Sequence, residues 1–91
     1  MSEHSEALAA VARLQALVAA GPITEEAPEL IRLSDLACSV IIDPALREKV
    51  AENLISALTV IRFASVFAHD PEPGRQQATK ILGLLANAPS A

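Results

Sequence analysis

The sequence predicts an all-α fold, a small bundle of four helices forming a single domain over residues 1–91. Hydrophobic residues make up 52% of the chain but aromatic residues only 2%, so Ala, Leu, Val and Ile must build the core. Such a composition favours packed helices over sheets. Proline and glycine punctuation divides the chain into four segments, and apolar residues recur within them at helical spacing.

The first helix is expected at about residues 5–20. Gly21 suits a left-handed C-cap, and Pro22 prevents the helix from continuing. The opposite face carries small residues that suit either solvent or the close approach of another helix: Ala9, Ala12, Ala16 and Ala19. The apolar stripe that should face the core has spacings of four, three and four, and consists of Ala7, Val11, Leu14 and Val18.

The second helix is expected from Thr24, as N-cap, or slightly later, to about Ile42, with Pro28 tolerated in the first turn. A helix that is apolar around most of its circumference should be central in the bundle or covered by something else. Such a pattern is present here, because Ile31, Cys38 and Ile42 fall outside the main stripe of Leu30, Leu33, Ala37, Val40 and Ile41.

The third helix is the longest, at about residues 43–68, and is expected to be the central spine of the bundle. Asp43 is its predicted N-cap, and Pro44 takes the first helical position. In its second half, apolar residues occupy both sides of the helix. The main stripe consists of Leu46, Val50, Leu54, Ala57, Leu58, Ile61 and Ala68.

The fourth helix follows the rigid turn at residues 70–74, whose sequence is DPEPG. Its single apolar face consists of Ala78, Ile81, Leu82 and Leu85.

Composition argues against several partners and locations. The net charge is −4 and the lysines and arginines are scattered, whereas binding to nucleic acid needs a basic face. Cys38 is the single cysteine, as expected for a protein of a reducing compartment, and we expect a cytoplasmic location. No apolar stretch reaches the roughly 18–20 residues that cross a bilayer, so no membrane partner is expected.

The sequence offers no catalytic, cofactor-binding or metal site, and the chain is not expected to be an enzyme. His4 and His69 are the only histidines, and neither is expected to form a metal site. Cys38 has apolar neighbours that should raise its pKa and make it inert. No glycine-rich phosphate loop is present.

The candidate site is instead a surface for another protein. Residues 53–68, NLISALTVIRFASVFA, contain only one formal charge, at Arg62, and apolar residues cover the helix on both sides. Arg62 is expected either to extend its charged group to water or to pair with a carboxylate. The predicted interface consists of Leu54, Arg62, Phe63, Val66 and Phe67.

Residues 33–74 resemble the small helical subunits of amidase-signature enzymes, such as that of 1-carboxybiuret hydrolase and, more distantly, the C subunit of the glutamyl-tRNA amidotransferase. The resemblance rests on the entry IDPALR into the third helix, VAENL within it and DPEPG after it. It implies that the chain has no catalytic residues. It also implies that Val50, Asn53, Leu54 and the stretch through Phe67 pack on a large amidase chain and stabilise it.

The sequence therefore predicts a non-catalytic helical module for protein–protein interaction, possessing no cofactor and acting as a small accessory subunit of a larger amidase-type enzyme. A self-associating homodimer would use the same surface and remains open. A third alternative is a small-molecule-binding regulator with an apolar pocket between the second and third helices.

Overall fold

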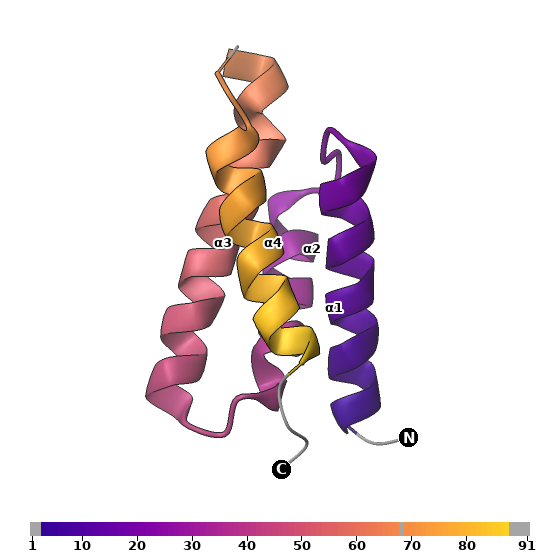
Figure 1. Cartoon of the computed structure of the whole chain (residues 1–91), viewed down its shortest axis with the longest axis vertical. Coiled ribbons are helices and arrows are strands. Elements are labelled where there is room, and N and C mark those ends of the chain that lie inside the picture. Colours follow the sequence, from indigo (N-terminus) through magenta and orange to yellow (C-terminus); the bar gives the residue numbers. More distant parts are fainter. Residues whose placement is uncertain (1–2, 68, 88–91) are drawn as a thin grey trace.

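The computed structural model describes residues 3–67 and 69–87, and every regular element in them is helical. The elements are α1 (Glu3–Ala20), α2 (Ala27–Ala37), a short 3-10 helix η1 (Cys38–Val40), α3 (Pro44–Phe67) and α4 (Glu72–Ala86). The four α-helices run alternately up and down the long axis of the molecule (Figure 1). The predicted all-α class and the four-helix bundle are confirmed.

The helices form a ring rather than a cluster around one central helix. α1 packs on α2 and α4, while α3 packs on α4 and, less extensively, on α2. α1 and α3 therefore lie diagonally across the core, as Figure 1 shows. Residues 43–68 do not form the expected spine encircled by the other helices. Short connections make neighbouring helices antiparallel, and α4 closes the ring by packing on α1.

The core lies between the four helices and is almost entirely aliphatic. Its largest fully buried side chains come from three helices: Leu14 and Val11 from α1, Leu54 and Leu58 from α3, and Leu82 from α4. Helix α2 contributes the buried residues Leu30, Leu33, Ser34 and Ala37.

Helix α1 follows the sequence prediction closely. All four residues of its predicted stripe are buried, and the four alanines of the opposite face are exposed. Gly21 has a positive φ of 118°, which a residue with a Cβ atom adopts only with strain.

Helix α2 begins slightly after Thr24, within the predicted range, but ends earlier than the predicted Ile42. Its N-cap is Glu26, whose carbonyl accepts hydrogen bonds from the amides of Glu29 and Leu30. After Ala37 the chain tightens into η1, where the Ser39 hydroxyl donates to the Leu36 carbonyl at 2.6 Å. Serine back-bonding competes with the regular helical ladder.

Helix α3 begins as predicted, since the Asp43 carboxylate accepts a hydrogen bond from the Ala45 amide at 3.2 Å. Its 24 residues span about 36 Å, whereas the 11 residues of α2 and 15 of α4 span about 16 and 22 Å. Both ends of α3 therefore extend beyond a neighbour. Leu46, which was expected in the core, is 50% exposed in the first turn of α3. Ala68 of the predicted stripe lies outside the described residues.

Helices α3 and α4 approach each other closely at Gly74. A Cβ atom at this position would lie 2.8 Å from the Ala57 carbonyl oxygen and 2.9 Å from the Val60 side chain. Only glycine fits here without displacing one helix. The junction between α3 and α4 then projects beyond the end of α1 (Figure 1).

Candidate functional site

The last two turns of α3 carry an apolar surface that the rest of the chain does not cover. We call Phe63, Val66 and Phe67 the α3 patch. Phe63 is half-buried, whereas Val66 and Phe67 are each 68% exposed. The two phenyl rings lie in contact with centroids 5.6 Å apart and planes inclined at 51°. A tilted aromatic pair of this kind keeps the two rings in a fixed relation.

Arg62 holds the α3 patch against the connection between α1 and α2. Its Nε donates a hydrogen bond to the Glu25 carbonyl at 2.9 Å, and its guanidinium carbon lies 4.8 Å from the centroid of the Phe63 ring. This distance permits a cation–π interaction. Arg62 is half-buried, and its partners in the structure are a backbone carbonyl and a ring rather than a carboxylate. Within the chain, Arg62 therefore links Phe63 of the α3 patch to the connection between α1 and α2.

Leu54 is not part of this surface, although the sequence placed it there. Its side chain is fully buried in the core of this chain. Leu54 lies on the side of α3 that faces the other three helices, one turn before Leu58, which is also fully buried. It therefore offers no area to a second protein while the bundle is folded.

His69 terminates α3. Its amide donates to the Ala64 carbonyl at 3.2 Å, and its ring Nε2 lies 3.1 Å from the Val60 carbonyl oxygen. Since a carbonyl can only accept, this contact requires the proton on Nε2. Val60 lies inside α3, so the His69 ring adds a side-chain donor to a carbonyl of the helix and holds the following connection against α3.

A second apolar surface lies at the opposite end of the molecule. It was not predicted from the sequence. We call it the α4 groove, a cavity of about 210 Å³ lined by Ile41, Val50, Asn53, Ile81, Leu84 and Leu85. Leu84 is 68% exposed, and Ile42, next to Ile41, is 70% exposed. Leu84 follows Ile81 by three residues, so the two side chains lie on neighbouring positions of the same helical face. This spacing could have predicted that Leu84 extends the apolar face of α4.

An apolar pocket was one alternative expected between the second and third helices, and the depression described there has a different character. The depression between α2 and α3 is lined largely by polar and charged side chains, namely Asp35, Ser39, Arg47, Glu48 and Glu52, with Pro44, Ala51 and Ile55. The large apolar side chains left uncovered lie instead at the outside of the bundle.

The thiol of Cys38 and the hydroxyl of Ser34 are both buried in the core region. Cys38 is fully buried, and burial, assisted by the negative charge of Asp35 and opposed by Arg47, raises the pKa of its thiol to about 11. It is therefore an inert small apolar residue, as expected. Ser34, which the sequence analysis did not single out, is also fully buried, and its hydroxyl has no hydrogen-bond partner within residues 3–67 and 69–87.

Over the described residues, His, Cys, Asp and Glu side chains do not gather in groups of three that could hold a metal ion. In the same part of the chain, no helix combines the length and apolar character needed to cross a membrane.

Comparison with known proteins returned no relatives: no family model matches the sequence, and neither curated proteins nor solved structures show significant similarity to it. The resemblance to the small subunits of amidase-signature enzymes therefore stays a prediction.

Proposed function

We propose that the chain is a non-catalytic, cytoplasmic interaction module whose α3 patch is covered by another protein. The exposure of Val66 and Phe67 beside the half-buried Phe63 carries the proposal. Full burial of one such side chain contributes about 1.5–3 kcal/mol, so a partner that covers the patch gains a substantial part of a binding free energy. Aromatic side chains in such positions are frequent centres of interface energy.

The arrangement of the patch supports this function. Arg62 anchors Phe63 through the Glu25 carbonyl, and the ring of Phe63 in turn contacts Phe67. A patch that is held in place before binding loses less conformational entropy when a partner covers it.

The partner we favour is the large chain of an amidase-type enzyme, which the accessory subunit would stabilise. This choice rests on the resemblance of residues 33–74. A second copy of this chain is the alternative partner, because two-fold homo-oligomers are common and would bury the same patch.

The test compares Phe67→Ser with Leu84→Ser in the full chain. Both side chains are 68% exposed, but they lie at opposite ends of the bundle. Tagged wild-type and variant proteins are used to capture partners from native cytoplasm, and their masses are measured by light scattering after purification. We expect Phe67→Ser to lose the associated chain, whether a large enzyme subunit or a second copy, and Leu84→Ser to retain it.

Three results would contradict the proposal. Retention of the partner by Phe67→Ser with its loss in Leu84→Ser would move the interface to the α4 groove. A wild-type protein that is monomeric and captures nothing would remove the interaction function itself. Enzymatic activity of the isolated chain, measured without a partner, would overturn the non-catalytic assignment.

A further inference from the structure

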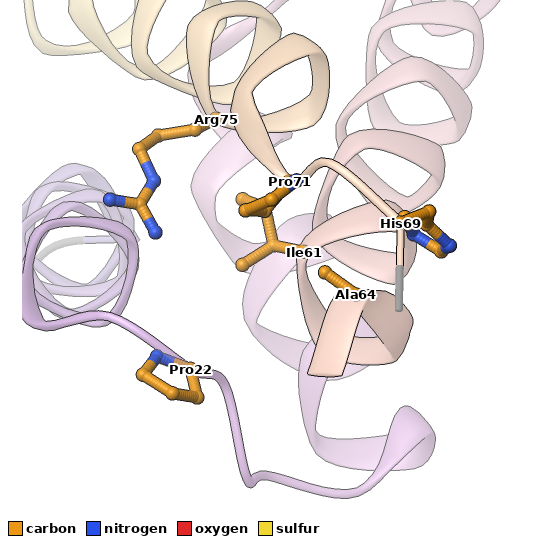
Figure 2. Close-up of a pocket in the computed structure, with 6 residues that line it drawn as sticks. All are labelled: Pro22, Ile61, Ala64, His69, Pro71 and Arg75. Atoms are coloured by element: carbon orange, nitrogen blue, oxygen red, sulfur yellow. The ribbon is translucent and has the colours of Figure 1, made fainter. Parts of the chain in front are cut away.

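A pocket separate from the α3 patch lies where the connection after α1 meets α3 and α4. It has a volume of about 220 Å³ and is lined by Pro22, Ile61, Ala64, His69, Pro71 and Arg75. Figure 2 shows Arg75 and Pro22 on one side of this Arg75 pocket, and Ile61, Ala64 and Pro71 across from them. The volume is somewhat below the range of about 300–1,000 Å³ found for pockets that bind drug-sized ligands, so the pocket suits a small organic molecule.

Arg75 is the unusual residue of this pocket. It is half-buried, and its Nε atom is inaccessible to solvent yet has no hydrogen-bond partner. Across the part of the chain that the structure describes, the Arg75 side chain takes part in no ion pair. A buried N–H group without an acceptor is destabilising and uncommon in folded proteins. A ligand cannot reach Nε itself, but the terminal nitrogens of the guanidinium are not buried and make no hydrogen bond or ion pair to the described residues, so they can donate to a ligand.

The rest of the lining limits the chemistry of that ligand. No acidic side chain lines the pocket, and Pro22, Ile61, Ala64 and Pro71 present an apolar wall. His69 is at the rim, but its Nε2 is already bonded to the Val60 carbonyl, and its ring lies away from Arg75 in Figure 2. One cation beside an apolar wall matches a molecule with one negative charge and a hydrocarbon body.

A carboxylate fits this description better than a phosphate. The planar guanidinium presents parallel N–H donors that match the two oxygens of a carboxylate. A phosphate ester carries more charge, and Arg75 is the only Lys or Arg that lines the pocket.

We propose that the Arg75 pocket binds a small aliphatic monocarboxylate, with its carboxylate on the Arg75 guanidinium and its hydrocarbon chain against Ile61, Ala64 and Pro22. This site does not depend on the α3 patch, so a chain without a protein partner would still bind the acid.

The experiment titrates sodium hexanoate into the full-length protein and follows the methyl resonances of Ile61 and Ala64 by NMR. 1-Hexanol serves as the uncharged probe of similar shape. We expect saturable shifts of both methyl groups with hexanoate and at least tenfold weaker binding of hexanol, because a hydrogen bond to a charged group changes affinity by roughly tenfold to a hundredfold.

Arg75→Gln should weaken hexanoate binding at least tenfold. Arg32→Gln is the matched control, because it removes the same charge from an exposed arginine that pairs with Glu29 at 2.6 Å on α2. It should leave hexanoate binding unchanged. Ala64→Leu is a second, independent test, because the larger side chain fills the pocket and leaves Arg75 in place. It should also abolish hexanoate binding.

Several outcomes would overturn the site. These are equal binding of hexanol and hexanoate, unchanged affinity in both Arg75→Gln and Ala64→Leu, and the absence of any saturable shift at millimolar hexanoate. Shifts confined to the methyl groups of Val66 or Leu84 would likewise overturn it, because they would place the hexanoate on an exposed apolar surface.

Discussion

Helices α1 and α3 lie diagonally across the same core, but they differ in what they leave to solvent. The outer face of α1 carries alanines and polar residues, and its most exposed large apolar side chain among the described residues is Leu8, at 37%. The last turn of α3 exposes Val66 and Phe67 almost twice as far. Both helices bury a regular apolar stripe in the same core, so the difference between them lies in the residues outside that stripe. In the described part of the two helices, only α3 places large apolar side chains there with more than half of their surface exposed.

The largest expected loss of stability comes from substitutions in the core that α1 and α3 share. Comparing the two helices tests whether they contribute equally to it. Leu14→Ala in α1 and Leu58→Ala in α3 each remove a fully buried side chain. Each should lower the free energy of unfolding by about 3–5 kcal/mol, through lost apolar burial and the cavity that remains. Urea unfolding followed by far-ultraviolet circular dichroism measures the change. A loss below about 1 kcal/mol for Leu14→Ala alone would show that α1 is not part of one cooperative core.

A smaller effect is expected at the contact that aligns α3 with α4. In Gly74→Ala the new Cβ would meet the Ala57 carbonyl and Val60 at under 3 Å, so the helices must separate. We expect a loss of about 1–3 kcal/mol in the same unfolding experiment.

Gly83→Ala is the matched control for Gly74→Ala. A Cβ at Gly83 would have no atom within 4 Å, and the residue lies inside α4. Alanine should therefore stabilise the protein by about 0.5–1 kcal/mol. Destabilisation by both substitutions to the same extent would contradict the close packing at Gly74.

The smallest effect concerns the outer faces of the two helices. Phe67→Ser in α3 and Ala12→Ser in α1 both replace exposed residues. Each should change the free energy of unfolding of the isolated chain by no more than about 0.5 kcal/mol. The same unfolding measurement, made on dilute protein, checks this. If Phe67→Ser cost more than about 2 kcal/mol while Ala12→Ser cost nothing, Phe67 would belong to the core of the chain.

Local signals in the sequence were sufficient to predict the helices and most of their buried faces. The Gly21–Pro22 pair and Asp43 with Pro44 marked boundaries that the structure confirms within a few residues. The end of α2 was missed because the apolar pattern continues through Val40 and Ile41, although the backbone changes to a 3-10 turn at Cys38.

The surfaces were harder to predict, because they depend on how far each helix extends past the others. Periodicity placed Leu46 on the same stripe as Leu54, yet one is half exposed and the other fully buried. Leu84 and Arg75 lie on surfaces that exist only once α4 has packed against α1 and α3. No spacing within a single helix contains that information.

The ring of alternating helices also bears on the order in which they are joined. The first turn of α1 and the last turn of α4 lie at the same end of the molecule (Figure 1), and these two helices pack on each other. The cycle of contacts therefore has no intrinsic starting point. A chain that joined α4 to α1 by a short linker and opened between α2 and α3 would meet the same packing requirements. The helical faces, and not the linear order of the segments, specify this bundle.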